Sequence, residues 1–92
     1  MTRIKIRELI WDKYNVEHIK KHNVTVKEAE GAVKNYIAHK RGKKGRYIAV
    51  GRSGTKLISL VVKRVSSGVY YPVSVRDSSK KERREIYEKE KI

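Results

Sequence analysis

Residues 46–88 read RYIAVGRSGTKLISLVVKRVSSGVYYPVSVRDSSKKERREIYE and carry the clearest structural pattern in the chain. Within this stretch, residues 57–62 are apolar at nearly every position, which is typical of a strand covered on both faces. The runs on either side of it alternate apolar and polar side chains, as flanking strands do. Gly54 and Gly68 lie in the connections, where tight antiparallel turns require a positive φ. The sequence therefore predicts an antiparallel three-strand meander followed by a basic helix.

The first part of the chain is expected to hold a strand and two helices. Residues 3–11 alternate at first and predict a strand. Asp12 is a good N-cap for a helix over residues 13–22. Residues 25–28, TVKE, fit a capping box, in which the Thr hydroxyl and the Glu carboxylate satisfy backbone N–H groups reciprocally. A second helix is therefore predicted from residue 26 to about residue 37.

The remaining segments complete an α+β fold. Residues 39–45, HKRGKKG, have two glycines and no apolar side chain, so they are predicted to form a mobile cationic loop. Ser79 and Glu82 repeat the capping-box spacing and begin the last helix. Pro72 predicts either an edge strand or a bulge, because it cannot donate a ladder hydrogen bond. We expect one domain over residues 1–92, with an antiparallel sheet of about four strands, two N-terminal helices and one C-terminal helix.

Composition points to a polyanionic partner. The 92 residues include 24 Lys and Arg but only ten Asp and Glu, which gives a formal charge of +14. The basic excess is divided equally between residues 1–45 and 46–92, so it belongs to the whole fold rather than to a tail. A hydrophobic fraction of 38% supports one modest core but no deep substrate cavity. Nucleic acid is the expected partner.

The absence of Cys and the scattered positions of the His residues exclude several classes of protein. Without Cys, the chain can form neither a disulfide framework nor a thiolate metal site. The three His lack metal-ligand spacing, so we expect no metal and no cofactor. The N-terminus has no apolar targeting segment, and no run approaches the about 20 apolar residues of a membrane span. A cytoplasmic protein without a membrane partner is expected.

Several short motifs, in this order and spacing, resemble the BrnT family of bacterial toxins. The matching motifs are Ile10-Trp11-Asp12, Lys21-His22, Arg46-Tyr47, Val50-Gly51-Arg52, Val73-Ser74-Val75-Arg76 and Lys81-Glu82-Arg83-Arg84-Glu85-Ile86-Tyr87. The chain differs from the family in Asn23, where members usually have Gly, and in the basic residues 39–45, where many have an acidic or Asp-Pro stretch. The resemblance implies a RelE-like fold and an endoribonuclease toxin of a type II toxin-antitoxin system. It also implies a BrnA-like antitoxin that neutralises the toxin and represses the operon by binding DNA.

Metal-independent RNA cleavage needs a base for the 2′-hydroxyl, cations for the phosphate and an acid for the leaving oxygen. The catalytic candidates are Arg76 and Arg83 as phosphate ligands, His22 as the base, and Tyr87 as a proton donor or a base-stacking group. Each also has a structural explanation. An Arg can pair with a carboxylate, His22 can stabilise a helix C-terminus, and Tyr87 can pack in the core. Glu82 is explained fully by its capping box.

Seven cations are candidates for contact with RNA. They are Lys40, Arg41, Lys43, Lys44, Arg46, Arg52 and Lys80. For Arg46 and Arg52 the alternative is a solvated strand end, and His39 is expected to be a solvated loop residue.

Two functions remain open at this point. The leading one is a metal-independent endoribonuclease toxin that inhibits translation and growth and is silenced by its cognate antitoxin. The other is a non-catalytic basic module that binds RNA or DNA, for which the charge alone would suffice.

Overall fold

The computed structural model describes residues 5–90, and the side chains of residues 5–88. Its elements in chain order are β1 (Glu8–Leu9), α1 (Lys13–Lys20), α2 (Val26–Lys34), β2 (Tyr36–Arg41), a short 3-10 helix (Lys43–Gly45), β3 (Tyr47–Ser53), β4 (Lys56–Ser66), β5 (Val69–Asp77) and α3 (Lys80–Glu90). The strands form a five-stranded sheet in the order β1-β5-β4-β3-β2. All neighbours are antiparallel except β1 and β5. The predicted α+β class is confirmed.

Short-range hydrogen bonds define where α1 and α2 begin. Asp12 and Asn15 bond each other's backbone N–H groups at 2.9 and 2.8 Å, which caps α1. Thr25 and Glu28 do the same at 3.0 Å in both directions, so the predicted capping box of α2 is confirmed. Within residues 5–90, none of the helices combines the length and the hydropathy that a membrane span requires.

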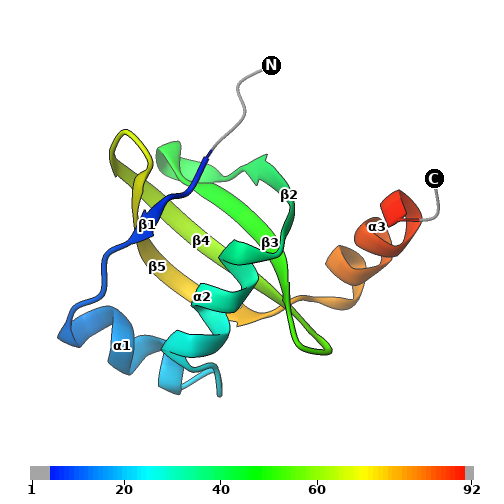
Figure 1. The fold of residues 1–92 in the computed structure, drawn as a ribbon, viewed down its shortest axis with the longest axis horizontal. Helices are drawn as coiled ribbons and strands as arrows, with labels where there is room; N and C mark the ends of the chain where they lie inside the picture. The colour runs from blue at the N-terminus through cyan, green and yellow to red at the C-terminus, as the bar shows by residue number, and fades with distance from the viewer. Residues whose placement is uncertain (1–4, 91–92) are drawn as a thin grey trace.

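Helices α1 and α2 cover one face of the sheet and form the main core (Figure 1). That core contains Ile19, Val24, Ala29 and Ala32 from the helical layer and Ala49, Ile58, Leu60, Val62 and Val75 from the sheet. Contact between α2 and β3 is very close at Gly51. A Cβ atom there would lie 1.7 Å from the carbonyl oxygen of Ala32. Only glycine therefore allows the backbone of α2 to approach β3 this closely.

Helix α3 packs on the opposite face of the sheet. Val50 and Leu57 alternate with the core residues of their strands, so they point to the other side. There they form a second, smaller cluster with Ile86 of α3, and Ile37 and Ala38 of β2 pack against it. Figure 1 shows α3 at one end of the sheet, well apart from α1.

A fifth strand, β2, is present where the sequence led us to expect the end of a helix and a loop. Helix α2 ends at Lys34 rather than near residue 37, and residues 36–41 pair with β3 instead of forming helix and loop. A register shift between Tyr36 and Ala38 leaves Ile37 as a bulge. The loop prediction was wrong for residues 39–41, which pair with β3, the next strand in the chain, and residues 43–45 form a short 3-10 helix in the connection between the two strands.

The other predicted boundaries differ by smaller amounts. Within the described residues, β1 spans only Glu8–Leu9, and residues 3–4 of the expected strand lie outside them. Helix α1 ends at Lys20, not at residue 22. At Pro72 the bulge alternative is confirmed, since the register with β4 shifts between Val61 and Val62. Strand β5 lies between β1 and β4 in the sheet order, but β1 pairs only with Val69 and Tyr70 and does not reach Pro72.

Candidate functional site

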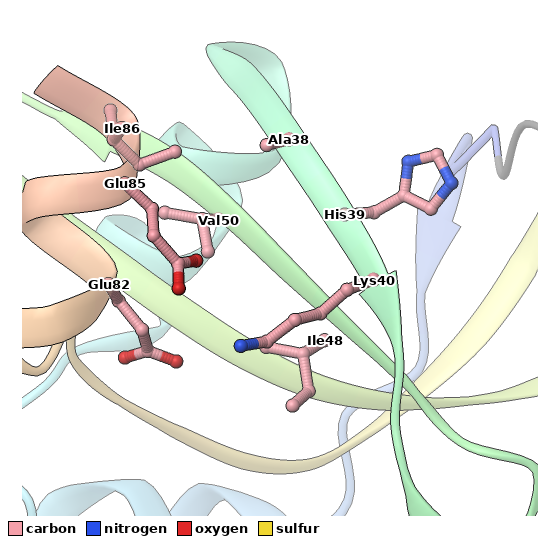
Figure 2. Close-up of a pocket in the computed structure, with 8 residues that line it drawn as sticks. All are labelled: Ala38, His39, Lys40, Ile48, Val50, Glu82, Glu85 and Ile86. Carbon is pink, nitrogen blue, oxygen red and sulfur yellow. The ribbon is translucent and has the colours of Figure 1, made fainter. Parts of the chain in front are cut away.

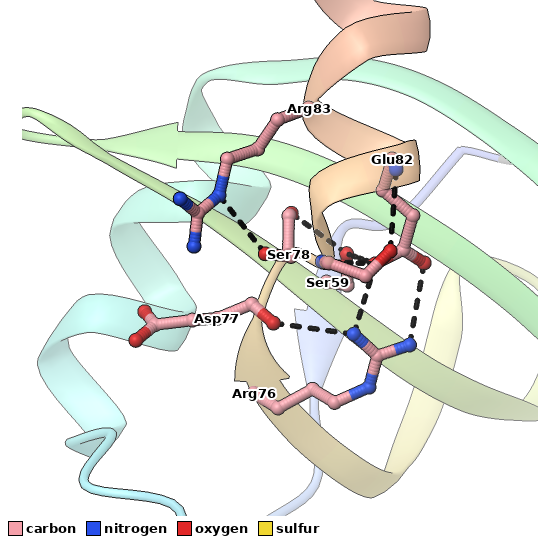
Figure 3. Close-up of polar contacts among 7 residues, drawn as sticks. Ser59, Arg76, Asp77, Ser78, Glu82 and Arg83 are labelled. Carbon is pink, nitrogen blue, oxygen red and sulfur yellow. Dashed lines mark hydrogen bonds and ion pairs between the residues drawn. The ribbon is translucent and has the colours of Figure 1, made fainter.

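A polar network joins the end of β5 to the start of α3 (Figure 3). The Arg76 guanidinium contacts both carboxylate oxygens of Glu82, at 2.9 and 3.3 Å. Glu82 also accepts hydrogen bonds from the Ser79 backbone N–H at 2.7 Å and from the Ser59 hydroxyl at 3.1 Å. The hydroxyls of Ser59 and Ser78 lie 2.8 Å apart. The predicted capping box at Ser79 therefore extends into a buried network that holds α3 on β4 and β5.

This network keeps Glu82 charged near neutral pH. Burial by itself would raise the pKa of Glu82, but hydrogen bonds from Arg76, the Ser79 backbone and Ser59, together with the charge of Arg76, lower the pKa to about 2. A carboxylate of that acidity is a poor base and a poor proton donor near neutral pH. The Arg76 guanidinium donates to Glu82 and, at 3.2 Å, to the Asp77 carbonyl. Pairing with a carboxylate is the structural explanation that the sequence also allowed for this residue.

Arg83 is held differently, and its guanidinium remains accessible. The Arg83 Nε atom donates to the Ser78 carbonyl at 3.0 Å, which fixes the side chain while the two terminal nitrogens point away from the network (Figure 3). Tyr87, one helical turn later, is 51% exposed. Both side chains border a shallow depression of about 180 Å³. Its lining residues are Thr55, Lys56, Leu57, Asp77, Arg83 and Tyr87.

The depression brings together two cations, a carboxylate and a phenol. Lys56 forms an ion pair with Glu28 at 2.9 Å, which raises the pKa of Lys56, and Asp77 contributes to this rise. Sequence reasoning did not single out Asp77 or Lys56. The sequence offered only their positions as a hint, since Asp77 is the last residue of β5 and Lys56 is the first residue of β4. A planar guanidinium beside an ammonium is suited to binding a phosphate, and a nearby carboxylate and phenol can exchange protons with it.

His22 lies elsewhere. It follows α1 in the exposed connection to α2, with its ring 5.3 Å from the ring of His18. Because α1 and α2 pack on the face opposite α3, the structure does not bring His22 together with Arg83 and Tyr87.

His39 is a strand residue rather than a solvated loop residue, so that expectation was wrong. Its side chain is half-buried in β2, where Nδ1 is hydrogen bonded to the Tyr36 hydroxyl. The two rings stack with centroids 5.9 Å apart. Figure 2 shows His39 pointing away from α3, whereas the neighbouring Lys40 points toward it.

The predicted RNA-contacting cations are distributed around α3 and the β2 end of the sheet. Lys40 and Arg41 lie on opposite faces of β2. Lys43 and Lys44 are exposed in the 3-10 helix, and Arg46 follows it. Arg52 borders an open hollow of about 570 Å³ with Asn35, Tyr36, Ile37 and Gly54. Lys80 is the first residue of α3. In the described part of the chain no group of three or more His, Cys, Asp or Glu is placed to hold a metal ion.

The fold and this surface define the class: a small basic α+β protein that presents an arginine-bearing C-terminal helix over one end of its sheet. No family model matches the chain, and no curated protein matches it in sequence. Among solved structures, the chain is similar to the crystal structure of the Brucella abortus ribonuclease toxin BrnT, with a TM-score of 0.63 and 25% sequence identity. The match covers 79% of this chain and 97% of that chain. The resemblance to the BrnT family predicted from the sequence is confirmed by this structural match.

Proposed function

We propose that this chain is an endoribonuclease toxin of a toxin-antitoxin pair, which acts on RNA in the cytoplasm and is neutralised by a cognate antitoxin. The observation that carries the proposal is the likeness to the Brucella ribonuclease toxin over 97% of that chain. The net charge of +14 supports a nucleic-acid substrate independently. Inhibition of translation and growth would follow from loss of the RNA.

Cleavage would take place at the depression between α3 and the β3–β4 hairpin. Arg83 would bind the scissile phosphate, because its terminal nitrogens are exposed at the depression, whereas Lys56 is held in an ion pair with Glu28. Asp77 would accept the proton of the 2′-hydroxyl as its oxygen attacks phosphorus. The bond from phosphorus to the 5′ oxygen would break, and Tyr87 would donate a proton to that leaving oxygen. The products would be a 2′,3′-cyclic phosphate and a 5′-hydroxyl end, with no metal required.

Arg76 and Glu82 support this surface rather than contact the substrate. Their ion pair fixes the first turn of α3, and that turn positions the Ser78 carbonyl and Arg83. His22 has no assigned step in this mechanism, because it lies on the opposite face of the sheet from α3.

The test is RNA cleavage by the purified protein in EDTA, with Arg83→Ala and Arg84→Ala measured beside the wild type. Arg84 is exposed on the same helix, so its replacement removes the same charge from a different face. We expect Arg83→Ala to lose about 100-fold or more in cleavage, and Arg84→Ala to lose little. Asp77→Asn should lower cleavage but preserve RNA binding. Cleavage that disappears in EDTA and returns with magnesium would contradict the proposed chemistry.

A non-catalytic RNA-binding module is the second candidate. Its support is the position of His22, the base expected from the sequence, which follows α1 on the face of the sheet opposite Arg83 and Tyr87. Tight, salt-sensitive RNA binding by a wild-type protein that cleaves no RNA under any of these conditions would favour this function.

A further inference from the structure

A small pocket opens between α3 and the face of the sheet that α3 covers (Figure 2). It has a volume of about 160 Å³. Its apolar lining consists of Ala38, Ile48, Val50 and Ile86. A protein cavity of about 150 Å³ can hold a benzene molecule, so this open pocket has room for the flat ring of a nucleobase. Ligand sites commonly combine such apolar walls with a few convergent polar groups.

Two charged side chains of opposite sign point into this pocket. Figure 2 shows the Lys40 ammonium entering it from β2 and the Glu85 carboxylate entering it from α3. Both residues are exposed. Among the described residues, neither side chain has a hydrogen bond or an ion pair, with the other or with any further group. A ligand in the pocket can therefore meet a donor on one side and an acceptor on the other.

The third charged residue of the pocket, Glu82, is already occupied. Its carboxylate accepts hydrogen bonds from Arg76, Ser79 and Ser59. Glu85 is therefore the acceptor that a ligand can use. The two carboxylates disfavour a phosphate group in the pocket, because like charges repel. The expected occupant is a neutral ring that carries N–H donors.

These groups match one nucleobase better than the other three. On its Watson–Crick edge guanine presents the O6 acceptor beside the N1–H and N2–H donors. The two donors can pair with the two carboxylate oxygens of Glu85, while O6 accepts from Lys40. Adenine, cytosine and uracil each have a single donor group on this edge, so none of them can pair in the same way with a carboxylate.

We propose that this pocket is a guanine-binding subsite of the ribonuclease, in which Glu85 and Lys40 bind the base and the apolar lining packs on its ring. The inference rests on the proposed function, because it names the base that the enzyme selects beside its cleavage site. Glu85 lines the pocket from α3, and Arg83 and Tyr87 border the depression from the same helix. RNA with a guanine in the pocket lies along α3, which brings the adjoining backbone toward Arg83.

The probes are 2′-O-methyl oligouridylates with one central guanosine, adenosine or cytidine, beside the all-uridine oligomer. Methylation blocks the 2′ oxygen as a nucleophile, so binding is measured without cleavage. By fluorescence anisotropy at one salt concentration, the full chain should bind the guanosine oligomer about tenfold or more tightly than the other three. Inosine lacks the N2–H donors, and in place of guanosine it should lose most of this preference. Equal affinities for all four oligomers, or preference for another base, would overturn the proposal.

Variants with matched controls test the two residues. Glu85→Gln should reduce the guanosine preference to about twofold or less, because an amide has one acceptor oxygen in place of two. Glu88→Gln removes the same charge from an exposed α3 residue outside the pocket and should keep the preference. Lys40→Met should also weaken the preference, whereas Lys43→Met, in the 3-10 helix, should lower the affinity for all four oligomers about equally. A preference that survives both Glu85→Gln and Lys40→Met would overturn the proposal.

Cleavage of unmodified RNA by the wild type is measured on the same preparation. Failure of cleavage with an intact guanosine preference counts against the proposed function alone, because base selection is read from oligomers that cannot be cleaved. Cleavage by a protein that shows no guanosine preference counts against the pocket alone.

Discussion

Arg76 and Glu82 face each other across the junction of β5 and α3, and the two terminal nitrogens of Arg76 donate to the two carboxylate oxygens of Glu82 at 2.9 and 3.3 Å. The pair lies between the sheet and the helix that bears Arg83, so it links the stability of the fold to the position of the candidate site. Arg76, which the sequence suggested as a phosphate ligand, forms an ion pair with a carboxylate of its own chain.

Replacing Glu82 by Gln is expected to destabilise the protein. The substitution removes the charge that Arg76 faces and weakens the acceptor for Ser79, which leaves a partly buried guanidinium without its counter-ion. We expect the free energy of unfolding to fall by about 2–3 kcal/mol, measured by urea denaturation. Glu85→Gln is the matched control, because Glu85 is exposed on the same helix. A loss no larger than that of the control would show that the pair contributes nothing net.

Acid should weaken the fold through the same residue. The pKa of Glu82 is about 2 in the folded state and 4.5 in its ordinary environment, so the unfolded state binds more protons between these values. The stabilisation is complete above about pH 4.5 and is lost as the pH falls through 2. It amounts to on the order of 3 kcal/mol. Urea denaturation from pH 6 to about 2 should show a shallower pH dependence for Glu82→Gln than for the wild type. Parallel curves would contradict the assignment.

Gly51→Ala should disturb the contact between α2 and β3. The added methyl group would overlap the Ala32 carbonyl oxygen, so the helix must move away from the sheet. We expect a loss of about 3 kcal/mol in the free energy of unfolding. Gly54→Ala is the control, because Gly54 has a φ of 61° but open space around it. It should cost only about 1–2 kcal/mol from backbone strain. Equal losses would mean that the close approach is not what requires glycine.

RNA binding should depend steeply on salt. Several phosphate contacts by spread cations release counter-ions, and each contact with single-stranded RNA contributes about 0.7 to the slope of log affinity against log salt. Fluorescence anisotropy with labelled RNA, over a series of salt concentrations, measures the slope. Arg83→Ala should reduce the slope by about one such contact. A flat dependence would argue against a phosphate-binding surface.

The local architecture can be predicted from the order of the amino acids alone. The capping boxes at Thr25 and Ser79 and the cap at Asp12 are interactions between residues three apart, so their spacing is visible in the chain. The meander was predictable because tight turns at Gly54 and Gly68 join strands that are neighbours in sequence. The charge that favours a nucleic-acid partner requires only composition.

The formation of β2 and the set of residues in the candidate site depend on how the elements pack together. Residues 36–41 become a strand because they pair with β3, and this pairing outweighs their weak local pattern. Asp77, Lys56, Arg83 and Tyr87 share one depression because α3 packs back on the end of the sheet, while α1 carries His22 to the opposite face. Sequence spacing reports which residues are neighbours along a helix or strand. It does not report which face of the sheet each helix covers, and that choice determines which side chains meet.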